Sequence, residues 1–286
     1  MPIVEEARAK INLALHVTGR RPDGYHELDM LVAFADVGDS VTLATSDTDG
    51  FVVDGPMAKG LSTDADNLVL RALRGFRELT GRTEPLSVRL TKRLPVASGI
   101  GGGSADAAAT LRGLCRLYAL SANDPALAEL ALSLGADVPM CLAGRPARVA
   151  GIGERIAPTT GRLSFGLLLV NPGVGVSTPA VFKALARRDN PPLPSLPAFD
   201  DVDRLSAFLT DATRNDLEAP ARDISPVIGD VLEALARQPE AKLARMSGSG
   251  ATCFGLFGDK AAAARAGERL MTDHPRWWIE PAMAAF

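Results

Sequence analysis

The amino-acid sequence predicts an α+β protein of about two domains. Strand and helix patterns follow one another without the strict alternation that a doubly wound parallel sheet requires. The length of 286 residues corresponds to about two domains at roughly 150 residues each. We therefore divide the chain into residues 1–160 and 161–286. Hydrophobic residues make up 47% and charged residues 23%, a composition that excludes a largely disordered chain.

The first half begins with strands and continues with helices. Apolar side chains alternate from Ala9 to Leu15 and predict a strand, as do residues 31–35, 41–44 and 87–91. Between the first two lies the turn-rich segment GRRPDGYHEL. Helix patterns begin near residues 64–67, near Ser104 and at Asp124, and the first and last of them end at glycines. The first of these helices has an apolar face made of Leu68, Ala72, Leu73, Phe76 and Leu79.

The second half opens with FGLLLV at 165–170, an apolar run that predicts a buried strand. A loop, a short helix near 181–186 and a proline-rich connector at 190–197 follow. Helical patterns cover residues 201–212, 226–237 and 260–271. Strands at 243–246 and 253–257 flank the turn SGSG, and a short tryptophan-containing strand ends the chain.

Charge and cysteine content narrow the function. The net charge of −3, from 31 basic and 34 acidic residues, argues against a protein that binds nucleic-acid backbone. No apolar stretch approaches the roughly 20 residues of a membrane span, and the N-terminus lacks a secretory signal. We therefore expect a cytoplasmic protein. Three scattered cysteines form neither a disulfide framework nor a zinc site, and we expect buried thiols.

The most informative segment is PVASGIGGGS, residues 95–104. Four glycines in five positions precede a helix, whose first turn offers unpaired N–H groups and the positive end of the helix dipole. This arrangement suits phosphate. No lysine follows the glycines as a Walker loop requires, and Ser104 stands where the dinucleotide fingerprint needs glycine. A plain flexible turn is the alternative.

Seven further segments accompany this loop. They are ARAKINLALHVTGRRPDGYHEL (7–28), DNLVLRAL (66–73), TKRLP (91–95), LGADVPMCL (134–142), NPGVGVSTPAVFK (171–183), RNDLE (214–218) and SGSGATCF (247–254). Together they resemble the GHMP kinases, and within them the branch that phosphorylates a cytidine diphosphate-linked methylerythritol in non-mevalonate isoprenoid synthesis. The resemblance implies an N-terminal lobe like domain 2 of ribosomal protein S5 and a ferredoxin-like C-terminal lobe. It also implies ATP with Mg²⁺, whose protein ligands we do not name.

The resemblance also implies roles for single residues. Asp137 would be the catalytic base, assisted by Lys10, and phosphoryl transfer needs both a proton acceptor and positive charge. Substrate contacts would come from Asn12, Tyr25, His26, Thr178 and Phe182, with the rings of Tyr25 and Phe182 clamping cytosine. SGSG would face the diphosphate. ATP contacts would come from Asn67, Leu68, Lys92, Pro95, Val96, Ala97, Ser98, Gly99, Ile100, Gly101, Gly102, Gly103, Ser104 and Ala105.

Other interpretations stay open on the residues alone. Lys10 could be an exposed strand lysine, Asp137 a loop or capping carboxylate, and Tyr25 a cover for the core beside a solvated His26. The family often carries SSN after the glycines, whereas this chain has Ser-Ala-Asp. The carboxylate of Asp106 could therefore face a metal ion or solvent. Rival functions are another GHMP kinase, of homoserine or mevalonate type, and an RNA-binding module of S5-like fold.

Overall fold

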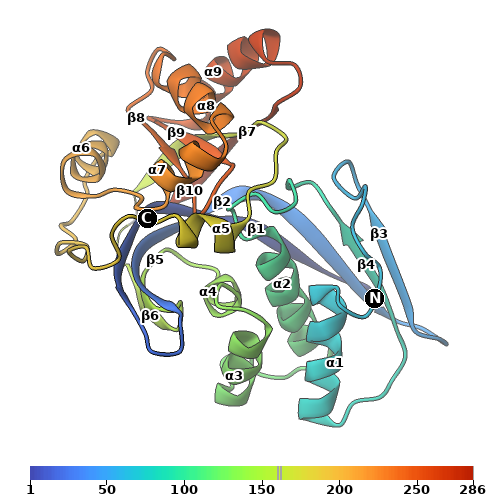
Figure 1. Ribbon diagram of the computed structural model, residues 1–286. Helices are drawn as coiled ribbons and strands as arrows, with labels where there is room; N and C mark the ends of the chain where they lie inside the picture. Colours follow the sequence, from blue (N-terminus) through green and yellow to red (C-terminus); the bar gives the residue numbers. More distant parts are fainter. Residues whose placement is uncertain (160, 162, 286) are drawn as a thin grey trace. The chain divides into compact units, whose positions relative to one another are not determined.

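The structure is a computed structural model that describes residues 1–159, 161 and 163–285 (Figure 1). The chain divides into two units. Unit 1 comprises Met1–Ala9, Gly38–Val96 and Gly101–Gly144, and unit 2 comprises Lys10–Val37, Ala97–Ile100 and Arg145–Phe286. The predicted boundary after residue 160 stays a prediction, and residue 160 itself lies outside the described residues.

Unit 1 combines a small sheet with helices. The C-terminal part of β2 pairs antiparallel with β4, with Val41 opposite Leu90, and β3 runs parallel to β4. The chain reaches these elements through two long strands that also contribute to unit 2. The elements are β1 (Ile3–Arg20), β2 (His26–Thr45), β3 (Gly50–Asp54), α1 (Leu68–Thr80), β4 (Leu86–Thr91), α2 (Gly102–Leu117), α3 (Pro125–Leu134) and α4 (Val138–Ala143).

Helix α1 shows how local sequence sets an element. The side chain of Asn67 caps its N-terminus by accepting from the Val69 N–H, and Gly81 ends it in the left-handed conformation at φ 70°. Its buried face includes Ala72 and Phe76, as predicted from the apolar spacing. Leu79, which the same spacing placed on that face, is 44% exposed because it lies in the last turn, near the helix end.

Unit 2 is built on an antiparallel sheet in the order β10, β7, β9, β8. The N-terminal part of β2 pairs with β5, which pairs with β6. The elements are β5 (Ala147–Gly151), β6 (Arg155–Pro158), β7 (Ser164–Asn171), α5 (Thr178–Lys183), α6 (Val202–Ala212), α7 (Glu218–Ile224), α8 (Val227–Ala236), β8 (Leu243–Met246), β9 (Cys253–Phe257), α9 (Lys260–Asp273) and β10 (Trp278–Ala285).

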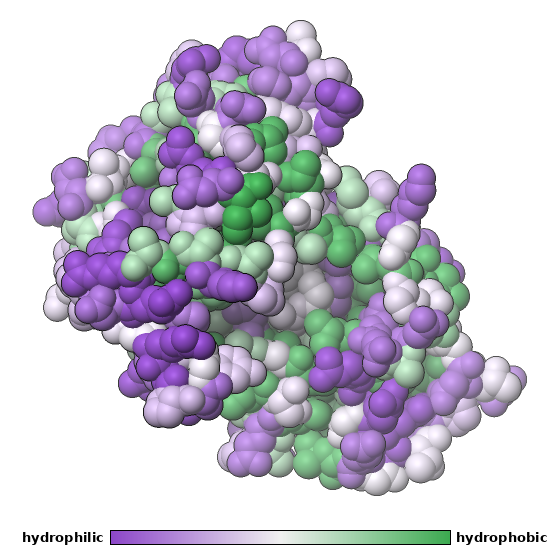
Figure 2. All heavy atoms as spheres, viewed as in Figure 1, coloured by the Kyte–Doolittle hydropathy of each residue, from purple (hydrophilic) through white to green (hydrophobic). Residues whose placement is uncertain are grey.

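Helices cover this sheet. Helix α8 packs on β8 and β9, and α9 packs on β7, β9 and β10 (Figure 1). The predicted buried strand at 165–170 is confirmed, since these residues form part of β7 and their apolar side chains are buried in the hydrophobic core. Figure 2 shows hydrophilic residues over the outer surface of α9, at the top of the view, whereas Ala262, Ala263, Ala266 and Leu270 of this helix are buried.

The predicted α+β class is therefore confirmed. The predicted helices and strands are present, although α5 begins at Thr178, three residues before the predicted start. Residues 31–35 and 41–44, expected as two strands, belong to the single strand β2. Five short elements were not predicted, namely β3, α4, β5, β6 and α7. The three cysteines are buried, as expected.

Candidate active site

The glycine loop leads into α2, which begins at Gly102, two residues before the predicted start. Gly101 occupies the N-cap position in the left-handed conformation at φ 68°, and no side chain caps the helix there. No acidic residue lies in the first turn. The first amides of the 16-residue helix therefore carry the positive partial charge that attracts an anion. No carboxylate in that turn competes for them.

The positive φ angles fall on particular glycines. Gly99 and Gly101 have φ of 76° and 68°, whereas Gly102 and Gly103 belong to the helix. A Cβ atom on Gly102 would lie 3.5 Å from Lys92 Nζ, at ordinary contact distance. Conformational freedom is therefore needed at Gly99 and Gly101, and not at Gly102.

Lys92 follows β4 directly and is buried, with a side chain 4% exposed. We expected it to contact adenosine, but its ammonium group lies between two carboxylates. Lys92 Nζ donates to Asp106 Oδ2 at 2.7 Å and also to Asp39 Oδ2. Asp106 therefore faces neither solvent nor an open metal site. The ammonium is held inside unit 1, because two buried carboxylates require a cation. The expected contact of Lys92 with adenosine stays a prediction.

Two other predicted adenosine contacts lie at the start of α1. Asn67 Oδ1 accepts from the Val69 N–H at 3.0 Å, and its Nδ2 donates to the Ser62 carbonyl at 2.8 Å. Its carboxamide is therefore engaged in capping. Leu68 lies beside the glycine loop, since its Cδ1 would be 3.3 Å from a Cβ atom on Gly103. The structure thus brings together one predicted adenosine contact and one predicted phosphate contact.

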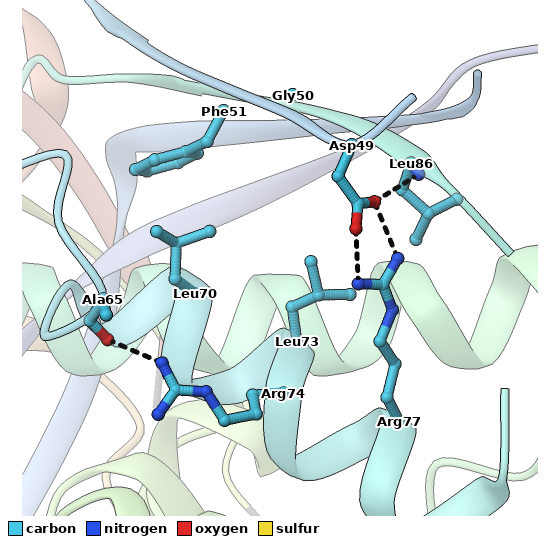
Figure 3. A pocket seen from close by; sticks show the side chains of 9 residues that line it. All are labelled: Asp49, Gly50, Phe51, Ala65, Leu70, Leu73, Arg74, Arg77 and Leu86. Atoms are coloured by element: carbon cyan, nitrogen blue, oxygen red, sulfur yellow. Dashed lines mark hydrogen bonds and ion pairs between the residues drawn. The ribbon is translucent and has the colours of Figure 1, made fainter. Parts of the chain in front are cut away.

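A cavity of about 430 Å³ lies in unit 1 against α1, β3 and β4 (Figure 3). None of the predicted site residues lines it. Arg77 reaches across it to Asp49 through two hydrogen bonds of 2.9 and 2.8 Å, and Arg74 donates to the Ala65 carbonyl. We therefore do not assign it to the nucleotide. Its lining is Asp49, Gly50, Phe51, Ala65, Leu70, Leu73, Arg74, Arg77 and Leu86.

The predicted catalytic aspartate lies at the N-cap position of α4, in unit 1. Asp137 has helical backbone angles, φ −85° and ψ −14°, and is half-buried. Its side chain makes no capping hydrogen bond to α4. A capping role, one of the open interpretations, is therefore not what the structure shows for this carboxylate.

The predicted catalytic lysine lies on β1, in unit 2. Lys10 is 3% exposed, which excludes an ordinary exposed strand lysine. Its Nζ donates to Asn12 Oδ1 at 2.8 Å, and the Asn12 N–H donates to Ser247 Oγ at 3.0 Å. Ser247 Oγ in turn donates to the Gly99 carbonyl at 3.2 Å. Strand β1 is thereby linked both to the glycine loop and to the SGSG turn.

The two glycine segments of unit 2 pack backbone against backbone. A Cβ atom on Gly99 would lie 2.4 Å from the Ser247 carbonyl oxygen, and one on Gly248 would lie 2.5 Å from the Gly99 carbonyl oxygen. Neither distance tolerates a side chain, so both glycines are required by close approach. The SGSG segment therefore not only forms a turn but also packs against the backbone of the glycine loop at Gly99.

Asn215 was not assigned a role from the sequence. Its Nδ2 donates to the carbonyls of Met246 and Gly248 at 2.8 and 2.9 Å, and it is 7% exposed. It holds the SGSG turn in place. The segment RNDLE, which contains Asn215, is among the segments that resemble the family, and this resemblance could have pointed to Asn215.

The predicted cytidine contacts lie in unit 2. His26 stacks on Phe182 with ring centroids 4.7 Å apart and an interplanar angle of 22°. Tyr25 is 60% exposed, so it does not cover the core. The ring stacked on Phe182 is thus that of His26, and the clamp of Tyr25 and Phe182 on cytosine stays a prediction. Thr178 Oγ1 lies 2.7 Å from Ser249 Oγ, next to the SGSG turn.

His26 has a further property that suits a ligand. Its Nε2 is buried and has no hydrogen-bond partner among the described residues. Burial lowers the pKa of His26, and the positive charges of Arg20 and Arg188 lower it further. The ring is therefore neutral at pH 7 and offers a nitrogen for hydrogen bonding. The two arginines add positive charge near the ring.

Within the described part of the chain, no group of three or more His, Cys, Asp or Glu side chains could hold a metal ion. Mg²⁺ usually binds through one or two carboxylates together with substrate phosphates. The described residues therefore offer no such three-ligand group of their own. No described helix is long and apolar enough to cross a membrane.

Comparison with known proteins gives two family matches. Residues 67–145 match the model of the GHMP kinases N terminal domain, and residues 194–275 match that of the GHMP kinases C terminal. A 4-diphosphocytidyl-2-C-methyl-D-erythritol kinase of Cereibacter sphaeroides is 55% identical over 98% of both chains. The enzyme of the same name from Mesorhizobium japonicum is 51% identical over 96% of this chain and 92% of its own.

Solved structures agree with these matches. A crystal structure of 4-(cytidine 5'-diphospho)-2C-methyl-D-erythritol kinase covers 100% of both chains, with a TM-score of 0.79 and 33% identity. The homoserine kinase from Cytophaga hutchinsonii has a TM-score of 0.71 over 99% of this chain and 94% of its own. At 19% identity, the latter supports the fold alone.

Proposed function

We propose a function for this chain on the premise that it belongs to the 4-diphosphocytidyl-2-C-methyl-D-erythritol kinases, a branch of the GHMP kinases. The reaction is transfer of the γ-phosphoryl group of ATP to the 2-hydroxyl of 4-diphosphocytidyl-2-C-methyl-D-erythritol. It belongs to the non-mevalonate synthesis of isoprenoid precursors. We further propose that the enzyme works in the cytoplasm.

The observation that carries the choice of substrate is the ring pair of His26 and Phe182. A flat aromatic face and a neutral ring nitrogen with no hydrogen-bond partner in the described part of the chain suit a pyrimidine base, which stacks on the one and hydrogen-bonds to the other. Tyr25, exposed on the neighbouring position, is proposed as the second stacking ring. Thr178 and the SGSG turn are proposed to contact the rest of the cytidine diphosphate.

The ATP site is proposed at the glycine loop. The first amides of α2 would bind the triphosphate, and Leu68 beside Gly103 would contact the adenosine. Since no described cluster holds a metal by itself, Mg²⁺ would bind with the nucleotide, where it neutralises phosphate charge. No protein ligand is assigned to it.

Asp137 is proposed as the base. It would accept the proton of the 2-hydroxyl as the oxygen bonds to the γ-phosphorus, and the bond from phosphorus to the β–γ bridging oxygen would break to release ADP. Lys10 would orient the reacting groups and offset the negative charge of the transferred group. Asn12, which accepts from Lys10 Nζ, would hold that ammonium in place.

The competing functions differ in the acceptor. Release of ADP should be measured with 4-diphosphocytidyl-2-C-methyl-D-erythritol, homoserine, mevalonate and no acceptor. We expect turnover with the first alone. Comparable turnover with homoserine or mevalonate would favour another GHMP kinase. No turnover with any acceptor, together with an RNA gel shift at physiological salt, would favour the RNA-binding module.

A further inference from the structure

Three buried charged residues meet beneath the first turn of α2. Asp39 comes from β2, Lys92 follows β4 and Asp106 lies in the second turn of α2. Lys92 Nζ donates to both carboxylates, at 2.7 Å to Asp106. A Cβ atom on Gly102 would be 3.5 Å from Lys92 Nζ and 3.7 Å from Asp39 Oδ2. The cluster therefore lies directly under the amides proposed to bind phosphate.

The cluster contains one cation for two carboxylates. Asp39 is fully satisfied, because its Oδ1 also accepts the N–H groups of Arg93 and Leu94 at 2.6 and 2.9 Å. Asp106 is not, since its Oδ1 is buried and has no hydrogen-bond partner among the described residues. An excess negative charge buried without partners is costly. A proton on Asp106 Oδ1 removes that charge, and no described hydrogen-bond donor occupies this oxygen.

Among the described residues of the helices that pack on α2, no further charged group is paired with this cluster. The elements that pack on α2 include α1, α3 and α4. Helix α4, with the sequence VPMCLA, has no charged side chain. The charged side chains of the other two helices are exposed or, for Arg77, paired with Asp49: they are Arg71, Arg74, Arg77, Glu78 and Glu129. The charge state of the cluster therefore depends on Asp39, Lys92 and Asp106.

We propose that Asp106 is a positioning residue for the nucleotide, which holds Lys92 beneath the phosphate-binding turn and takes up a proton when the phosphates bind. This inference rests on the proposed ATP site. A phosphate chain at the first turn of α2 adds negative charge above the cluster. Protonation of Asp106 lowers the repulsion between the two, so binding and protonation favour each other.

The pKa values agree with this geometry. Burial, opposed by the charge of Lys92 and reinforced by that of Asp39, raises the pKa of Asp106 to about 7. Burial also opposes the charge of Lys92, but the two carboxylates outweigh it and raise the pKa of Lys92, which keeps it protonated. The sign follows: a bound polyanion raises the Asp106 pKa further, so nucleotide affinity falls as pH rises through neutrality.

The test is calorimetric titration of the intact enzyme with ADP in excess Mg²⁺, between pH 6.5 and 8.5. Two buffers of different ionisation enthalpy at each pH give the number of protons taken up. Asp106→Asn is the matched variant, because it keeps the shape and the acceptor for Lys92 but cannot ionise. Asp124→Asn, at the exposed N-cap of α3, controls for loss of an acidic group.

We expect the wild type to take up a fraction of a proton, and its Kd for ADP to rise roughly 3- to 10-fold over this range. In Asp106→Asn the proton uptake and the pH dependence of the Kd should disappear. Equal pH dependence in both proteins, or no proton uptake by the wild type, overturns the inference. The wild-type proton count decides even if the variant does not fold. No ADP binding at any pH would instead overturn the proposed nucleotide site.

Discussion

Asp137 is the residue on which the proposed chemistry most depends. Asp137→Asn keeps the size of the side chain but removes the proton acceptor. We expect kcat to fall about 10²- to 10⁴-fold, the usual contribution of a general base, while ATP affinity changes by no more than a few fold. Steady-state kinetics and calorimetry measure the two. Asp124→Asn, the same change at another helix N-cap, should leave both unchanged. A variant that keeps half of its kcat would contradict the assignment.

Phe182 and Tyr25 are the residues proposed to hold the base. Phe182→Ala removes the face on which His26 stacks, and Tyr25→Ala removes an exposed ring. Since stacking of a base on an aromatic ring is worth about 1–3 kcal/mol, we expect each change to raise KM for the cytidine substrate roughly 5- to 150-fold. KM for ATP should stay the same. Tyr118→Ala, an aromatic residue of unit 1, is the control.

The melting temperature distinguishes a base-binding role of Tyr25 from a role in packing. Because Tyr25 is 60% exposed, Tyr25→Ala should leave the melting temperature nearly unchanged. A lowered melting temperature with an unaltered KM would show that the ring stabilises the fold and does not bind the base. The predicted partner ring also makes the double variant informative, since its cost should be less than the sum of the single changes.

The sequence does not predict how the residues of the candidate site pair with one another. Lys92 was expected at the nucleotide because its segment TKRLP resembles the family, but its carboxylate partners lie 53 and 14 positions away along the chain. His26 and Phe182 meet across a still larger distance in sequence. Such pairings depend on the order of the strands, which a local pattern does not contain.

Helix α2 and the loop before it set the geometry of the proposed phosphate site. Gly101 has φ 68° at the N-cap, where a side chain would be strained by about 1–2 kcal/mol. Gly101→Ala should therefore shift the first turn and weaken ATP binding at least 10-fold. Gly81→Ala is a close match, at φ 70° and with nothing near its Cβ position. It should cost similar stability and leave ATP binding unchanged, as calorimetry and thermal melting would show.

Gly102→Ala extends the same test. Its Cβ atom would meet Lys92 Nζ at 3.5 Å, an ordinary contact, and its backbone is helical. We therefore expect a folded protein with smaller loss of ATP affinity than Gly101→Ala. If Gly101→Ala bound ATP as tightly as the wild type, the first turn of α2 would not be the phosphate site.

The sequence predicted the extent of some helices and strands only in part. Strand β2 looked like two strands because Asp36 and Asp39 interrupt its apolar run. In the structure Asp39 accepts two backbone N–H groups and contacts Lys92, so the strand continues through a carboxylate. The missed helix α4 has six residues and a proline in its first turn, too short for an apolar period to show.

His16 links the stability of the whole molecule to pH. It is fully buried, its Nε2 accepts from the Arg214 N–H at 3.1 Å and its Nδ1 donates to the Pro191 carbonyl at 3.0 Å. Burial lowers the pKa of His16, although the hydrogen bond to Pro191 opposes this. The unfolded chain therefore takes up a proton first as pH falls below about 6.5.

We consequently expect the free energy of unfolding to fall below pH 6.5, by up to about 1.4 kcal/mol per pH unit from His16. Asp106 acts in the opposite direction, because its pKa is raised in the folded state to about 7 and its protonation stabilises that state. His16→Gln isolates the histidine, since Asp106 is common to both proteins. Urea denaturation at pH 7.5, 6.5 and 5.5 should show a smaller loss in the variant, and parallel profiles would contradict this origin.

The most direct test of the account identifies the phosphorylated atom. The proton-coupled ³¹P spectrum of the product formed from 4-diphosphocytidyl-2-C-methyl-D-erythritol and ATP should be recorded. The 2-carbon bears the methyl group and no hydrogen, so a phosphate on its hydroxyl should give one new singlet, with one ADP formed per product. The diphosphate signals of the substrate should persist. A new signal split by neighbouring protons, or ADP formed without a new phosphate ester, would contradict the proposed reaction.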